Sequence, residues 1–138
     1  MVQLIIGEKG KGKTKVLLDR ANEDVLKANG NFVYLDKSTK HMFELNNKVR
    51  LIDVSAYPIE NSDEFIGFLS GIISQDHDLE KMYFDNFLSI ANCADSFEAV
   101  LDKIEKISNS FKVDFVISMS KTEADLSDGW KNCVIVSL

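Results

Sequence analysis

The chain has 138 residues, of which 45% are apolar, and its formal net charge is −6. This length suits one domain with one hydrophobic core, and no apolar run approaches the roughly 18 residues that a membrane span requires. No charged segment precedes the first apolar run, so we expect no secretory signal. The two cysteines lack a CxxC spacing, and the two histidines complete no metal-binding signature. We therefore expect a single domain over residues 1–138 in the reducing cytoplasm.

The charge is distributed unevenly along the chain. Residues 1–40 carry eight basic and five acidic side chains, whereas residues 51–138 carry six basic and sixteen acidic ones. A protein that binds nucleic acid usually presents a broad basic face. The positive charge is instead concentrated near one glycine-rich segment, which favours local neutralisation of phosphate over nucleic-acid binding.

The first half of the chain alternates between strand-like and helix-like segments. An apolar run at residues 2–6 predicts a strand, and apolar residues at helical spacing predict a helix over residues 14–28. Gly30 should end this helix, because glycine adopts the left-handed conformation easily. Two further strands, with a turn of helix between them, are expected at residues 32–36 and 49–54.

The second half of the chain continues the alternation. Asn61 with Glu64, and Asp95 with Glu98, have the spacing of capping boxes, and each pair precedes an amphipathic helix. Apolar runs predict strands at residues 81–85, 113–118 and 133–137. Strands that alternate with helices imply right-handed crossovers. The expected fold class is therefore α/β, with a mainly parallel sheet sandwiched by helices.

Residues 7–14, GEKGKGKT, match the pattern G-x-x-x-x-G-K-[ST] in full, between the first expected strand and the first expected helix. Glycines let the backbone curl so that its N–H groups point at an anion, and the helix adds the positive end of its dipole. In this pattern, Lys13 reaches the β- and γ-phosphates and the Thr14 hydroxyl binds Mg²⁺. Solvent exposure is the favoured alternative for the side chains of Lys9 and Lys11. The predicted nucleotide-binding residues are Gly7, Glu8, Lys9, Gly10, Lys11, Gly12, Lys13, Thr14 and Lys15.

A phosphate-binding loop of this kind needs a carboxylate that holds the metal, at the carboxyl end of a nearby apolar strand. Three expected strands end in an aspartate, namely Asp36, Asp53 and Asp85. We assign the role to Asp85, because the residues before it are the most uniformly apolar and bulky. Its separation from the loop, about seventy residues, is also usual for this pairing. Thr14 and Asp85 are therefore the predicted metal ligands.

These motifs resemble those of the P-loop NTPases, and within them the RecA-like group with an additional strand (the ASCE group). GEKGKGKT resembles the Walker A motif, KMYFD the Walker B motif, and VDFVISMS the strand that follows. The resemblance implies that this later strand lies between the other two, with Ser118 or Ser120 near the γ-phosphate. It also implies ATP and Mg²⁺ as ligands. More loosely, the chain is similar to small bacterial ATP-binding proteins labelled as twitching-motility ATPases, a label from which we infer no role in motility.

The chain departs from the pattern of that family at the positions that usually hold the water-activating glutamate. Asn86 follows Asp85 where many of these ATPases have a glutamate, and Ser38 stands where RecA-like proteins place theirs. Asp36 is then the nearest carboxylate, and we predict that it positions the water. Lys13 and Asp36 are the predicted catalytic residues.

Arginines are scarce in this chain, and only Arg20 and Arg50 are present. Because neither is an obvious arginine finger, either a second subunit donates Arg50 or hydrolysis is slow. Nucleotide kinases usually carry several arginines, and the Asn-Lys-x-Asp motif of GTPases is missing, so adenine nucleotides are preferred. Two functions stay open: a slow Mg²⁺-dependent ATPase that cleaves the β–γ bond, and a non-hydrolysing nucleotide-dependent switch or partner-binding module. A homo-oligomer or a protein partner is compatible with both.

Overall fold

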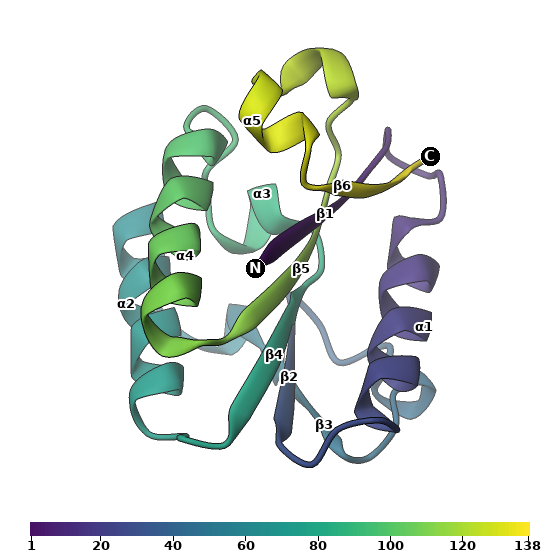
Figure 1. The fold of residues 1–138 in the computed structure, drawn as a ribbon, viewed down its shortest axis with the longest axis vertical. Coiled ribbons are helices and arrows are strands. Elements are labelled where there is room, and N and C mark those ends of the chain that lie inside the picture. The colour runs from purple at the N-terminus through teal and green to yellow at the C-terminus, as the bar shows by residue number, and fades with distance from the viewer.

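The computed structural model describes residues 1–138 and contains one six-stranded sheet (Figure 1). The strand order is β3-β2-β4-β5-β1-β6, and every pairing is parallel. The expected α/β class is confirmed, and the sheet is wholly parallel. The strands are β1 (Val2–Ile6), β2 (Asn31–Asp36), β3 (Val49–Asp53), β4 (Leu79–Phe84), β5 (Asp114–Met119) and β6 (Val134–Ser137).

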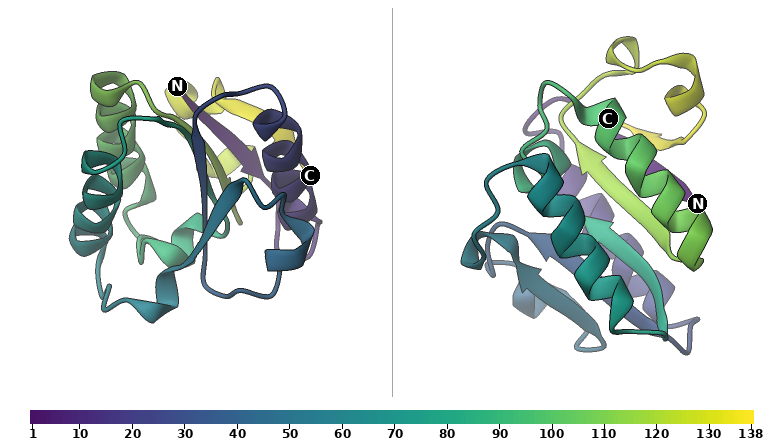
Figure 2. Two further views of the ribbon diagram at one scale, coloured as in Figure 1. Left: turned by 90° about the horizontal axis from the view of Figure 1, so that it is seen from below. Right: turned by 90° about the vertical axis from the view of Figure 1, so that its left-hand side faces the viewer.

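Helices cover both faces of the sheet. One face is covered by α1, and the opposite face by α2 and α4 (Figures 1 and 2). None of the helices has the length and apolar character that crossing a bilayer would require. The helices are α1 (Lys13–Val25), α2 (Ser62–Ser74), α3 (Phe87–Ile90), α4 (Phe97–Phe111) and α5 (Asp128–Lys131), with 3-10 turns η1 (Met42–Glu44), η2 (Val54–Ala56) and η3 (Glu123–Asp125).

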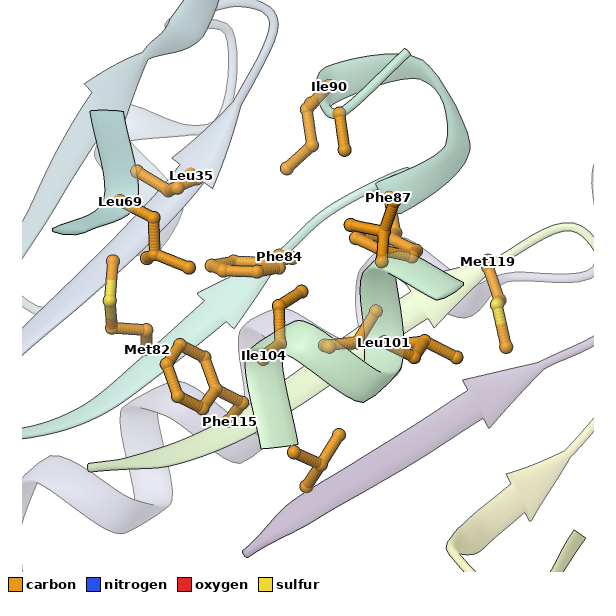
Figure 3. Close-up of a cluster of buried hydrophobic side chains, with 14 of the residues drawn as sticks. Leu35, Leu69, Met82, Phe84, Phe87, Ile90, Leu101, Ile104, Phe115 and Met119 are labelled. Carbon is orange, nitrogen blue, oxygen red and sulfur yellow. The ribbon is translucent and has the colours of Figure 1, made fainter. Parts of the chain in front are cut away.

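The hydrophobic core is divided by the sheet into two clusters. Between the sheet and α2, α3 and α4 lie 25 buried residues, and between the sheet and α1 lie 11. Phe84 is central to the larger cluster and lies beside Phe115 (Figure 3). Its ring meets those of Phe65 and Phe115 edge-on at centroid distances of 5.5 Å. Each such side chain contributes roughly 1.5–3 kcal/mol when fully buried. The core therefore fixes β4 and β5 firmly at the centre of the sheet.

The end of the first helix differs from the prediction. The helix α1 stops at Val25, and the N–H of Leu26 bonds to the carbonyl of Glu23 in a tighter turn. Gly30 does not adopt the left-handed conformation. Its role is steric, because a Cβ atom at Gly30 would overlap the Asp78 carbonyl oxygen and the Glu80 side chain.

The two expected capping boxes behave differently. Asn61 caps α2, since its Oδ1 accepts a 2.9 Å hydrogen bond from the Glu64 N–H, although the Glu64 carboxylate bonds to Glu60 rather than to Asn61. The pair Asp95 and Glu98 was predicted wrongly. Ser96 is the cap residue of α4, and the Glu98 carboxylate instead accepts a 2.8 Å bond from the N–H of Ser127. A tertiary contact has replaced the local one.

Candidate functional site

The loop between β1 and α1 lies next to the carboxyl end of the chain (Figure 1). Gly7, Gly10 and Gly12 have positive φ angles of 152°, 86° and 91°. At Gly7, a Cβ atom would also lie only 2.9 Å from the carbonyl oxygen of Leu138, so a larger residue does not fit there. Gly12 is the left-handed residue from which α1 starts. Backbone geometry therefore accounts for the glycines at both ends of the motif.

The backbone amides of this loop have no acceptors within the chain. From Glu8 through Lys15, no N–H group donates a hydrogen bond to the backbone or to a side chain. The helix α1 begins at Lys13 with no side-chain cap and no acidic residue in its first turn. Its positive end is therefore uncompensated. A run of free amides at such a helix end is suited to binding an anion.

Lys13 is folded back over this loop. Its Nζ donates a 2.9 Å hydrogen bond to the carbonyl oxygen of Glu8. Partial burial lowers the pKa of Lys13, and the negative charge of Asp85 acts in the opposite direction. The ammonium group thus lies over the free amides, where it would meet a bound phosphate.

The other lysines near the loop are placed differently. Lys9 and Lys11 are exposed, as we predicted for their side chains, and they form no ion pair. The Lys15 ammonium forms an exposed ion pair of 2.6 Å with Asp19, so only its amide remains free. The Lys121 ammonium lies 4.9 Å from the ring centroid of Phe97. Of these cations, Lys13 alone is folded over the loop.

Three polar side chains lie at the ends of neighbouring strands, on the α1 side of the sheet. Tyr34, Tyr83 and Val116 belong to the core cluster under α1. Side chains two positions apart in a strand share a face. The residues two positions further on, Asp36, Asp85 and Ser118, therefore face the same side as the loop.

Asp85 is the centre of the hydrogen-bond network in this site. The Thr14 hydroxyl donates to Asp85 Oδ1 at 3.1 Å, the Tyr34 hydroxyl donates to Oδ2 at 2.8 Å, and the Ser118 hydroxyl lies 3.4 Å from Oδ1. The Asp85 side chain is buried, with 5% of its surface exposed. The structure thus brings together the two residues that we predicted as metal ligands.

The oxygen atoms of Thr14 and Asp85 are candidate ligands for a magnesium ion. No group of three or more His, Cys, Asp or Glu side chains lies close enough to hold a metal without help. Mg²⁺ is typically bound by one or two protein oxygens together with water and substrate phosphates. The pair from Thr14 and Asp85 matches that donor set.

Asp36 lies beside Asp85 with one oxygen free. Its Oδ1 accepts a 2.7 Å hydrogen bond from the N–H of Lys37, whereas its Oδ2 is buried and has no partner. Burial raises the pKa of Asp36, and the nearby charge of Asp85 raises it further. A buried carboxylate with a free oxygen and a raised pKa is suited to accepting a proton from water.

The third strand-ending aspartate, Asp53, has a local structural role. It lies at the end of β3, the edge strand, and its Oδ1 accepts hydrogen bonds from the N–H and the hydroxyl of Ser55. These bonds cap the turn η2. Of the three candidates for the metal ligand, only Asp85 contacts Thr14.

Tyr34 is a residue of this site that our sequence analysis missed. The sequence could have indicated it, because Tyr34 stands two residues before Asp36 in the same strand and both side chains therefore lie on one face. Its hydroxyl is held at the site because the ring is buried and stacks on Tyr83 at a centroid distance of 6.3 Å. Tyr34 thereby fixes the orientation of the Asp85 carboxylate.

We expect Tyr34→Phe to lower the free energy of unfolding by about 1.5–3 kcal/mol, because it removes a buried hydrogen bond to a carboxylate. Urea denaturation of the variant and the wild type measures this loss. Tyr57→Phe is the matched control, since the Tyr57 side chain is 49% exposed and its hydroxyl makes no hydrogen bond. Equal losses in both variants would contradict the proposed role of Tyr34.

No side chain in the Asp85 network takes the place of a catalytic glutamate or an arginine finger. Asn86 adopts a left-handed conformation, and its N–H donates a 3.0 Å bond to the Ser118 hydroxyl. Arg20 lies within α1, and Arg50 lies on the edge strand β3. Ser120 is exposed and makes no hydrogen bond with its side chain. Asp36 is thus the one free carboxylate beside Asp85.

Comparison with models of known protein families gave no match, and comparison with curated proteins gave none either.

Proposed function

We propose that this protein binds ATP together with Mg²⁺ in the loop between β1 and α1 and hydrolyses it slowly. The observation that carries the proposal is the conjunction of free amides from Glu8 to Lys15 with the Lys13 ammonium folded over them. The Thr14–Asp85 hydrogen bond supports the proposal, because it brings together two oxygens that would hold Mg²⁺ beside the same loop. Phosphates would bind the amides and Lys13.

The order of the strands supports the resemblance to RecA-like P-loop NTPases. β5 lies between β1, which leads into the loop, and β4, which leads into Asp85. The small Ser118 side chain at this position leaves room for the Thr14 hydroxyl to reach Asp85 across the end of β5. This is the arrangement that the resemblance implies.

In the proposed reaction, a water oxygen attacks the γ-phosphorus of ATP and the bond to the β–γ bridging oxygen breaks, giving ADP and inorganic phosphate. Asp36 Oδ2 would accept the proton of the attacking water, since it is the free carboxylate oxygen in the site. Mg²⁺ would neutralise charge on the β- and γ-phosphates. No arginine lies among these residues, which is why we propose slow turnover.

A nucleotide-dependent switch without useful hydrolysis is the second candidate. It is favoured by Asn86, which stands after Asp85 where a glutamate would activate water and whose N–H is already bonded to Ser118. In that case the protein would bind ATP, retain it, and pass the change to a protein partner or a second copy of the chain.

We expect Mg²⁺ with ATP to raise the midpoint of thermal unfolding more than ATP with EDTA does. Ligand that binds only the folded state stabilises it by about 2.7 kcal/mol at a hundredfold excess over its Kd. A thermal-shift panel of ATP, ADP, GTP and GDP, with and without Mg²⁺, measures the effect and the base preference. If no nucleotide shifts the midpoint, the proposal fails. A shift without phosphate release over a long incubation selects the switch.

A further inference from the structure

A cavity separate from the loop site runs beside the edge strand β3 and has a volume of about 590 Å³. Its floor is formed by the first residues of β2 and by β3, and its wall by α2. Arg50 pairs in register with Val33, and Ile52 with Leu35, so both β3 side chains lie on the face that α2 covers. On this face, no helix other than α2 lies over β3 (Figure 2, right).

Part of the lining of this cavity is apolar and incompletely packed. Ile52, Phe68 and Ile72 line it and are only partly buried, although they pack against the larger core cluster. Tyr57 also lines the cavity, and its ring is tilted by 46° against that of Phe68 at a centroid distance of 5.1 Å. A volume between 300 and 1,000 Å³ with such a lining is typical of small-molecule sites.

Two cations border the cavity without a partner in the chain. Lys48 and Arg50 are exposed, and their side chains form neither an ion pair nor a hydrogen bond. The one carboxylate of the lining, Asp76, accepts hydrogen bonds from Asn31 and from the N–H of Asp78. The lining therefore carries a positive balance in a chain whose net charge is −6.

Two glycines in the wall have no packing function within the chain. A Cβ atom at Gly67 or Gly71 would meet no atom within 4 Å. Glycine within a helix costs about 1 kcal/mol relative to alanine. The absence of side chains here keeps the cavity open.

We propose that this cavity binds a small amphipathic organic anion. Its apolar body would lie between β3 and α2, against Ile52 and Phe68, and its anionic head would meet Arg50 and Lys48. Coulomb attraction and a charge-assisted hydrogen bond from the guanidinium would orient the head. The proposal is independent of the proposed nucleotide site, because the two share no residue.

Two fluorescent probes with the same aromatic body test separately the apolar contact and the contact with the anionic head. Anilinonaphthalene sulfonate carries an anionic group, and N-phenylnaphthylamine is its uncharged parent. We expect saturable binding of the sulfonate at one site per chain, and weaker binding of the parent. Excess Mg²⁺ with ATP should displace neither probe.

Variants of the lining complete the test. Arg50→Gln should weaken sulfonate binding about tenfold and change binding of the parent by less than about twofold. Lys106→Gln, an equal change of charge on the exposed face of α4, should change neither. Gly71→Leu should fill the cavity and weaken the binding of both probes at least about tenfold. Circular dichroism should show that this variant keeps an intact thermal transition.

Four results would overturn the proposal. The first is that the sulfonate does not bind saturably. The second is that Arg50→Gln behaves like Lys106→Gln. The third is that a folded Gly71→Leu variant binds both probes as the wild type does. The fourth is that ATP displaces the probe from the wild type but not from Lys13→Ala, which would show that the probe binds at the loop site.

Discussion

Replacing Lys13 by alanine should raise the Kd for ATP with Mg²⁺ by about 10- to 100-fold, because a charge-assisted hydrogen bond to phosphate contributes roughly 1.5–3 kcal/mol. The fold should survive the change, since the Lys13 side chain makes a single hydrogen bond, to the carbonyl of Glu8, and is only partly buried. Isothermal titration calorimetry measures the affinity, and phosphate release should fall in parallel at subsaturating ATP.

Lys11→Ala is the matched control for this experiment. Lys11 lies in the same loop, is exposed and forms no ion pair. Its removal takes the same charge from the same neighbourhood, and we expect less than about a threefold change in Kd. If Lys11→Ala weakens binding as much as Lys13→Ala, the loop attracts nucleotide only through its general charge, and the proposed phosphate contact of Lys13 is wrong.

Replacing Asp36 by asparagine should have two opposite effects: hydrolysis falls and stability rises. Loss of a general base typically lowers the rate about 10²- to 10⁴-fold. Asparagine keeps the oxygen that accepts the Lys37 N–H and removes a buried charge next to Asp85. We expect the free energy of unfolding at pH 7 to rise by about 1 kcal/mol, or roughly 4 °C in the unfolding midpoint. Single-turnover phosphate release and urea denaturation measure the two effects.

The gain in stability should depend on pH. The pKa of Asp36 is raised above its ordinary value of 3.8 in the folded protein. The folded state therefore binds more protons than the unfolded state above pH 3.8, and wild-type stability falls as the pH rises through the folded pKa. The amide of the Asp36→Asn variant does not titrate, so the difference between variant and wild type should be largest above the folded pKa of Asp36 and vanish below about pH 4.

Asp53→Asn is the control for Asp36→Asn, because the two aspartates are paired in register on adjacent strands. The Asp53 carboxylate accepts two hydrogen bonds from Ser55 and has no free buried oxygen. We expect this variant to be no more stable than the wild type and to hydrolyse ATP at the wild-type rate. A stability gain from Asp53→Asn, or unchanged hydrolysis in Asp36→Asn, would remove Asp36 from the proposed mechanism.

The sequence was sufficient to predict the elements whose signals are local. The strand at residues 2–6, the glycine turn after it and the helix capped by Asn61 all follow from patterns within about ten residues. A period of two or of 3.6 residues, a positive φ angle and a capping hydrogen bond are short-range effects. The predicted capping pair of Asp95 and Glu98 was wrong because a distant group, the N–H of Ser127, took the Glu98 carboxylate.

What the sequence by itself determined about this protein is therefore an α/β fold and a glycine-rich loop with Lys13 and Thr14 at its end. The tertiary structure decided which of three similar aspartates meets Thr14. The order of the strands puts only β5 between β4 and β1, whereas β3 lies at the far edge of the sheet. It also decided that Tyr34 holds Asp85 and that α2 leaves a cavity open beside Arg50. These contacts join residues far apart in the chain, and their geometry depends on how the whole sheet packs against its helices rather than on any local pattern.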